Sequence, residues 1–156
     1  VLEDLYPLME PFASYSLQKF LFLAPGWHLF SLPIAAAIPL LPNWKAYSWD
    51  PYTKSYREEE LLLPWKSYWL YVDEPTPLAL GRLPIVEQYF RLPPGWNLIG
   101  STYTTANITA PKGKVLPVYF TYDPEAKRYV PTTSIEPTYA YWVYLWKPAA
   151  ITVAPQ

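Results

Sequence analysis

The chain reads LAPGWHLFS over residues 23–31 and LPPGWNLIG over residues 92–100. In both stretches Pro-Gly signals a turn, and the residues after it alternate in the way typical of a β-strand. The match pairs Trp27 with Trp96 and His28 with Asn97 at one offset of 69 residues. A turn and strand that occur twice predict a chain built from two similar β-structured halves.

Two further motifs extend the repeat. Residues 49–51 (WDP) return as residues 122–124 (YDP), and residues 68–71 (YWLY) return as YWVY, both at an offset of 73. The second copy therefore carries four extra residues between its first and second motifs, and from there on no gap is needed. Self-similarity at a fixed spacing is the signature of an internal repeat. The chain divides into an N-terminal extension (residues 1–17), copy one (18–81) and copy two (82–156).

Each copy has the pattern of short strands separated by Pro and Gly. Asp followed by Pro favours a type I turn, so residues 49–51 and 122–124 predict hairpins. The joint between the copies, residues 82–84, is too short for a flexible linker. We expect an all-β fold of two tandem, pseudo-symmetric antiparallel modules, of the sandwich or small-barrel type, packed together. Short helices are expected only at residues 1–9 and 58–63.

Composition excludes several classes of function. The 156 residues are 51% apolar, enough for one domain or two small ones. The absence of Cys excludes disulfides, thiol catalysis and thiolate metal sites. A net charge of -1 gives no electrostatic footprint for nucleic acid, and no apolar run approaches the roughly 18 residues of a membrane span. Twenty Pro with only three Asn and three Gln favour a thermophilic source.

The residues that could carry catalysis have simpler structural explanations. His28 is the only His, and Asn97 takes its place in copy two, which argues for a structural role. Asp50 and Asp123 recur like the paired acids of a glycosidase, but the turn before Pro explains both. Residues 58–60 (EEE) indicate a solvated loop without the spaced oxygen ligands of a calcium loop. We expect no enzyme, no cofactor and no metal site.

Aromatic side chains are the strongest functional signal. The strand at residues 139–146 (YAYWVYLW) alternates so that both of its faces are largely apolar. A sheet with two apolar faces needs a second cover: the other copy, a partner subunit, or a flat ligand such as a sugar ring. We expect Trp27 and Trp96 to be equivalent core anchors. The candidate contact residues are Trp69, Tyr71, Trp142, Tyr144 and Trp146, with Leu2, Leu5, Tyr6 and Leu8 in the N-terminal extension.

Charge is divided unevenly between the two halves. Residues 1–81 carry nine acidic and five basic side chains, a formal charge of -4, whereas residues 82–156 carry four acidic and seven basic ones, a charge of +3. This asymmetry favours head-to-tail contact between copies of the chain. A head-to-tail contact that does not close into a ring gives a filament. The N-terminal extension would contribute by adding a strand to the sheet edge of a neighbour.

The motifs at residues 95–100, 122–124 and 141–144 resemble those of tandem β-repeat modules found in secreted and cell-surface proteins of bacteria and archaea. Those modules typically read Gly-Trp-Asn-Leu-Ile, a Tyr-Asp-Pro turn, and Gly-Tyr-Trp-Val. The chain departs from them at Ser67 and Ala140, where the modules have Gly. The resemblance implies an extracellular protein with a structural or adhesive role and no catalytic residue. Asn107 opens an Asn-Ile-Thr glycosylation sequon, which matters if the protein is secreted.

The sequence therefore favours a non-enzymatic extracellular structural protein from a thermophile. It would be the subunit of a self-assembling surface filament, sheath or similar assembly, with a second copy as its partner. One alternative is a carbohydrate-binding module that binds polysaccharide through exposed aromatic side chains. Another is a virion structural protein, which would assemble by the same logic.

Overall fold

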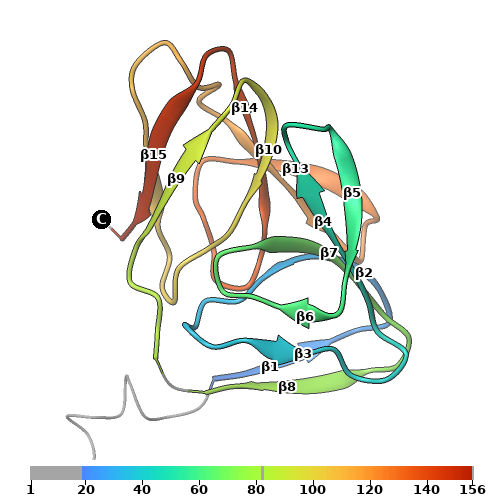
Figure 1. Cartoon of the computed structure of the whole chain (residues 1–156). Coiled ribbons are helices and arrows are strands. Elements are labelled where there is room, and N and C mark those ends of the chain that lie inside the picture. The colour runs from blue at the N-terminus through green and yellow to red at the C-terminus, as the bar shows by residue number, and fades with distance from the viewer. Residues whose placement is uncertain (1–18, 82, 156) are drawn as a thin grey trace, which may run out of the picture.

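The computed structural model describes residues 19–81 and 83–155, and all regular structure in these residues is β (Figure 1). Every pair of neighbouring strands is antiparallel. The strands of copy one are β1 (Lys19–Leu23), β2 (Gly26–Ser31), β3 (Ile38–Pro39), β4 (Lys45–Asp50), β5 (Ser55–Glu59), β6 (Leu61–Leu62), β7 (Ser67–Val72) and β8 (Thr76–Leu80). Those of copy two are β9 (Gln88–Leu92), β10 (Gly95–Ile99), β11 (Asn107–Thr109), β12 (Tyr119–Asp123), β13 (Arg128–Thr132), β14 (Tyr141–Leu145) and β15 (Ala149–Ala154).

The two copies build the same four-stranded sheet. Its order is β2-β7-β4-β5 in copy one and β10-β14-β12-β13 in copy two, so corresponding strands occupy corresponding places. A second layer in each copy pairs β1 with β8 and β9 with β15. None of these sheets closes into a barrel, and the arrangement is sandwich-like. The prediction of an all-β, antiparallel fold is confirmed.

The repeat extends to individual turns. The Oδ1 atom of Asp50 accepts N–H bonds from the second and third residues after it, at 2.9 and 3.3 Å. Asp123 does the same at 2.9 and 3.2 Å. Lys54 and Lys127, four residues after each Asp, both have a φ of 54°. The turn role expected for the two aspartates is therefore confirmed.

His28 and Asn97 close equivalent loops with different side chains. The Nε2 atom of His28 donates to the carbonyl oxygen of Ala24 at 2.6 Å. The Nδ2 atom of Asn97 donates to the corresponding carbonyl oxygen, that of Pro93, at 3.0 Å. Two different donors serve the same purpose, so the structural role predicted for His28 is confirmed.

Each copy has its own apolar core, with a fully buried Tyr in it. The hydroxyl oxygen of Tyr68 accepts the backbone N–H of Leu63 at 2.8 Å, and that of Tyr141 accepts the N–H of Glu136 at 2.8 Å. Burial raises the pKa of both Tyr68 and Tyr141 to about 12. These bonds fix the loop that precedes β7 in copy one, and the loop that precedes β14 in copy two, to the core of that copy. The main buried residues around the two tyrosines are Leu32, Leu62, Leu70 and Leu80 in copy one, and Ile99, Ile135, Val143 and Leu145 in copy two.

Two sequence-based expectations are wrong. Residues 58–63 are not helical, because β5 continues to Glu59 and pairs with β4, and β6 then pairs with β3. Trp27 and Trp96 are not core anchors, because they are 42% and 44% exposed. Side chains alternate along a strand, so Trp27 faces away from the core that Phe30 enters. The expected helix at residues 1–9 lies outside the described residues.

The two tyrosine bonds give a first prediction. Tyr68→Phe and Tyr141→Phe should each lower the free energy of unfolding by about 1 kcal/mol, because a partly buried backbone N–H loses its acceptor. Denaturant unfolding followed by tryptophan fluorescence measures this loss. Tyr119→Phe is the control, since Tyr119 is also buried but no described backbone N–H donates to its hydroxyl. Equal effects at Tyr119 and at Tyr68 would contradict the assignment.

Candidate functional site

The aromatic faces of the two four-stranded sheets pack against each other. Trp69 on β7 meets Tyr122 on β12 edge to face, with ring centroids 5.0 Å apart. Trp49 on β4 meets Trp142 on β14 in the same way at 5.5 Å. Because Trp49 corresponds to Tyr122 and Trp69 to Trp142, the two contacts are equivalent under the internal symmetry. Together with Leu29, Ala140, Leu98 and Phe120 they form a third cluster, the shared core.

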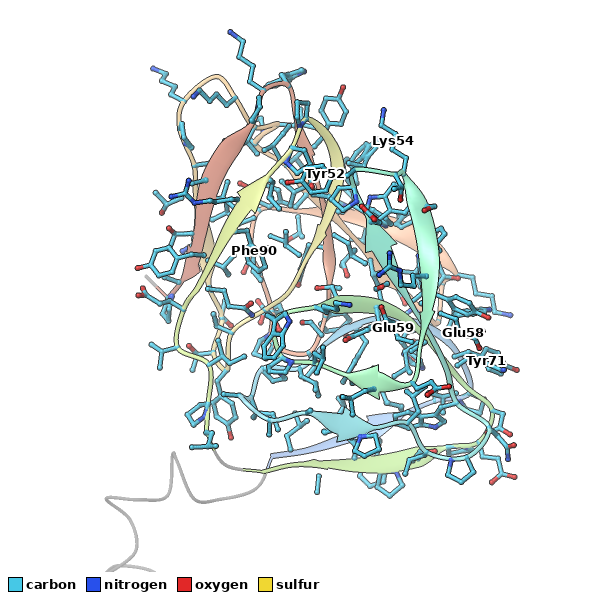
Figure 2. The ribbon with its side chains drawn as sticks, viewed as in Figure 1. Tyr52, Lys54, Glu58, Glu59, Tyr71 and Phe90 are labelled. Carbon is cyan, nitrogen blue, oxygen red and sulfur yellow. The ribbon has the colours of Figure 1, made fainter. Side chains whose placement is uncertain are left out.

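The shared core shows what covers the second apolar face. Of the three covers expected from the sequence, the other copy is the one that covers the centre of each aromatic face. Trp142 is only 9% exposed and Trp69 is partly buried, so both make their contacts within the chain. Tyr71 and Tyr144 are partly exposed, and Trp146 is 51% exposed. Figure 2 shows Tyr71 at the outer edge of copy one. The remaining candidates, Leu2, Leu5, Tyr6 and Leu8, lie outside the described residues.

A buried polar contact joins the copies beside the shared core. The hydroxyl groups of Ser31 and Ser101 are 2.9 Å apart, and that of Ser31 donates to the carbonyl oxygen of Tyr139 at 2.6 Å. Next to them, a Cβ atom placed on Gly100 would lie 3.2 Å from the Cβ of Ser31. Ser31 and Gly100 are corresponding positions of the repeat, so the two copies meet here at equivalent residues.

An open groove flanks the shared core on each of two sides. We call these the aromatic grooves, because the residues that line them are Trp, Tyr and Phe. The larger, of about 500 Å³, is lined by Trp49, Tyr56, Trp96, Phe120, Tyr129 and Trp142. The smaller, of about 460 Å³, is lined by Trp27, Tyr47, Tyr56, Trp69 and Tyr122. Each residue of the smaller groove corresponds to one in the larger, so the grooves are equivalent under the internal symmetry.

Trp27 and Trp96 are held in place by neighbouring rings, although they are 42% and 44% exposed. Tyr71 packs on Trp27 and Tyr144 packs on Trp96, both with centroids 5.2 Å apart. This explains the exposure of the two tryptophans: they form groove walls rather than core. Burial raises the pKa of Tyr129, an effect that the neighbouring Trp142 partly opposes. The Nε1 of Trp142 is buried without a hydrogen bond of normal geometry to any described residue.

A second type of cavity, here called the copy-one cleft, lies where copy one meets β9 and β10. Its volume is about 290 Å³. Unlike the aromatic grooves it combines charged, polar and aromatic side chains. Copy one contributes Ser48, Trp49, Asp50, Pro51, Arg57, Trp65, Lys66 and Ser67, and copy two contributes Phe90, Leu92, Asn97 and Leu98.

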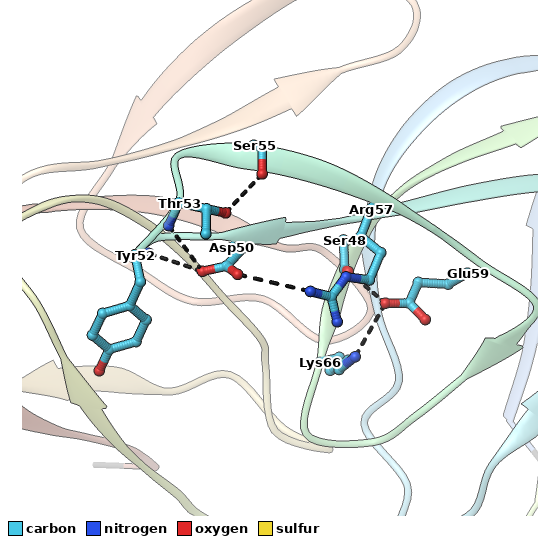
Figure 3. A network of polar contacts seen from close by, with 8 residues as sticks. All are labelled: Ser48, Asp50, Tyr52, Thr53, Ser55, Arg57, Glu59 and Lys66. Atoms are coloured by element: carbon cyan, nitrogen blue, oxygen red, sulfur yellow. Dashed lines mark hydrogen bonds and ion pairs between the residues drawn. The ribbon is translucent and has the colours of Figure 1, made fainter.

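The charged groups of this cleft are paired with one another (Figure 3). Asp50 lies 3.9 Å from the guanidinium group of Arg57. Glu59 accepts a hydrogen bond from the Ser48 hydroxyl at 2.7 Å and one from Lys66 at 3.1 Å. The sequence-based expectation of a solvated loop at residues 58–60 is therefore wrong for Glu59, which is partly buried and bonded to Ser48 of β4 and to Lys66.

Both carboxyl groups are held in their ionised form. Two backbone N–H bonds, from Tyr52 and Thr53, lower the pKa of Asp50. Burial opposes the ionisation of Glu59, but the bonds from Ser48 and Lys66 outweigh it and lower its pKa. Neither group is therefore poised to donate a proton near neutral pH.

The corresponding region of copy two keeps the aspartate, as Asp123, but lacks counterparts of Arg57, Glu59 and Lys66. The residues that match the cleft in sequence again surround a cavity, lined by Thr121, Tyr122, Asp123, Pro124 and Val130 among others. There Val130 stands in place of Arg57, Tyr139 in place of Lys66, and Thr132 in place of Glu59. The charged network is thus specific to copy one, and the repeated fold does not require it.

Metal and membrane sites are not evident in the described residues. Residues 19–81 and 83–155 contain no group of three His, Asp or Glu side chains that could hold a metal ion. In the same residues no helix has the length and apolar character needed to cross a bilayer. Asn107 of the sequon begins β11 and is partly exposed.

Comparison with protein-family models, with curated proteins and with solved structures finds no match to this chain. The resemblance to tandem extracellular modules therefore stays a prediction. Sequence reasoning found the aromatic strands but missed Tyr56, Arg57, Trp65 and Lys66 as site residues. The available signal was the comparison of the copies, since Lys66 falls on Tyr139 and Arg57 on Val130.

The Glu59 network predicts a pH dependence. Because the folded pKa of Glu59 is lowered, its contribution to stability is present above the unfolded pKa of about 4.3 and is lost as the pH falls through the folded value. Glu59→Gln should lower the free energy of unfolding by about 1 kcal/mol at pH 7. The difference from the unsubstituted protein should shrink below about pH 4. Denaturant unfolding at a series of pH values measures it.

The matched control is Glu58→Gln, whose side chain is 57% exposed and pairs only with the exposed Lys45. This change should cost less than about 0.5 kcal/mol at any pH. If Glu59→Gln lowered the free energy of unfolding by the same amount at pH 3 as at pH 7, the charge of the carboxylate would not be the stabilising element.

Proposed function

We propose that this protein is a non-catalytic, extracellular structural protein whose copies associate through the aromatic grooves. The observation that carries the proposal is the presence of two equivalent, all-aromatic grooves on one chain. Exposed apolar patches mark interaction sites, and Tyr, Trp and Phe are enriched where protein surfaces meet. A chain with two such surfaces can bind two neighbours at once, which is the minimum needed for a linear assembly.

Charge supports a second copy as the partner. The half of the chain that contains copy one has a formal charge of -4, and copy two has +3. Exposed acids in copy one include Glu58, Glu60 and Asp73, and exposed bases in copy two include Lys112 and Lys147. Opposite charges favour the approach of copy one of one molecule to copy two of the next. The contact is then head to tail and can repeat.

The N-terminal extension is the proposed filler of the grooves. It carries Leu2, Leu5, Tyr6 and Leu8, apolar side chains that would bury their surface between aromatic rings. A terminal segment with apolar side chains is a common way for one chain to dock on another. Trp146, half exposed at the end of β14, is the proposed contact residue outside the grooves.

Sedimentation of the full chain tests the proposal. The protein should form particles far larger than 18.1 kDa, whose size grows with concentration. Trp27→Ser combined with Trp96→Ser should return it to the monomer, because each change removes the main wall of one groove. Deletion of residues 1–17 should do the same. Tyr89→Ser is the control, since Tyr89 is 72% exposed but lies outside both grooves.

Two results would count against self-association. One is a chain that stays at 18.1 kDa at every concentration. The other is an assembly that the double tryptophan variant leaves intact, while its thermal unfolding shows that it is folded. A monomer that binds polysaccharide, and loses this binding in the double variant, would move the function to the carbohydrate-binding alternative.

A further inference from the structure

The copy-one cleft contains features that folding alone does not explain. The internal repeat supplies its own control, because positions required by the fold are filled in both copies. Asp50 and its counterpart Asp123 meet that standard. Arg57 and Lys66 do not, since Val130 and Tyr139 occupy their places in copy two. The repeated fold therefore does not require Arg57 and Lys66, which can serve a further purpose in copy one.

Two buried polar atoms at this cleft lack partners. The hydroxyl of Ser67 and the Oδ1 atom of Asn97 make no hydrogen bond to any described residue. The two residues are only 6% and 1% exposed, and both line the cleft. An unpartnered buried polar atom costs about 1 to 3 kcal/mol. The position of Ser67 does not need a hydroxyl, because the fully buried Ala140 fills it in copy two.

The rest of the cleft suits a neutral, hydroxyl-rich ligand. Each cation is already paired with a carboxylate, Arg57 with Asp50 and Lys66 with Glu59, so neither an anion nor a cation finds a free counter-charge. Aromatic surface is nevertheless present: Trp65 is 65% exposed, and Phe90 comes from the facing copy. A volume of about 290 Å³ is at the small end for ligand pockets.

We propose that the copy-one cleft binds one neutral sugar residue, such as the end of a glycan chain. Asn97 Oδ1 and the Ser67 hydroxyl, which are buried in the free protein, turn toward the sugar when it binds, and its hydroxyl groups then satisfy these two unpartnered atoms. Others donate to Asp50 and accept from Arg57 or Lys66. The apolar C–H face of the ring packs on Trp65. This site shares only Trp49 with the residues that line the aromatic grooves, and its existence does not depend on self-association.

Saturation-transfer NMR with the full chain tests this site, using glucose, galactose, mannose and N-acetylglucosamine as separate probes at millimolar concentration. At least one sugar should bind, and its affinity is then measured by titration calorimetry. Arg57→Val combined with Lys66→Tyr places the copy-two residues into copy one, where an equivalent backbone already tolerates them. This variant should weaken binding at least tenfold.

Ser67→Ala separates ligand binding from folding. Because Ser67 has no partner in the free protein, its removal should leave the midpoint of thermal unfolding unchanged or raised. It should still weaken sugar binding several-fold. A purely structural Ser67 would give the opposite pattern, with lower stability and unchanged binding.

The groove variant Trp27→Ser with Trp96→Ser is the second control. It should bind sugar as well as the unsubstituted chain, because neither tryptophan lines the cleft. The proposal is overturned if none of the four sugars binds, if the Arg57 and Lys66 variant binds normally, or if only the groove variant loses binding. If the groove variant loses assembly but still binds sugar, both proposals are supported. The two proposals can therefore fail independently of each other.

Discussion

The structure depends on the packing of one aromatic sheet face against another. Each four-stranded sheet has two apolar faces, and only one of them covers the core of its own copy. The second face would otherwise expose a row of Trp and Tyr rings to water. Trp69 on Tyr122 and Trp49 on Trp142 close these faces on each other. The contact involves β2, β4 and β7 of copy one and β10, β12 and β14 of copy two, and rings at its margins remain open and form the grooves.

The sequence predicted what depends on local chemistry. Turn residues and alternation located the strands and the repeat, and Asp before Pro located the hairpins. Burial could not be predicted in the same way. When both faces of a strand are apolar, alternation separates Trp27 from Phe30 but does not say which face is covered. Residues 58–63 were misread because a run of acidic residues resembles a helix, whereas pairing with β4 and β3 decides the outcome.

The candidate sites differ in how much of each can be predicted from the sequence. The aromatic strands were identified as a group, but their division between shared core and grooves depends on how the two sheets overlap. The copy-one cleft joins side chains from β4, β5 and the start of β7 with others from β9 and β10. No local pattern connects segments so distant in the chain. The only trace in the sequence is the mismatch between the copies at Arg57 and Lys66.

The close approach of Ser31 and Gly100 has a consequence for how the halves choose partners. Any two-fold contact between identical modules sets each axial residue against itself. Two copies of the first half would crowd serine against serine, and two of the second would leave a gap between glycines. The unlike pair avoids the tight contact of 3.2 Å that a Cβ atom at Gly100 would make with the Cβ of Ser31. The duplicated chain has thus become a covalent heterodimer, whose halves are no longer interchangeable. Pairing of like halves from two different chains would not reproduce this serine-to-glycine contact.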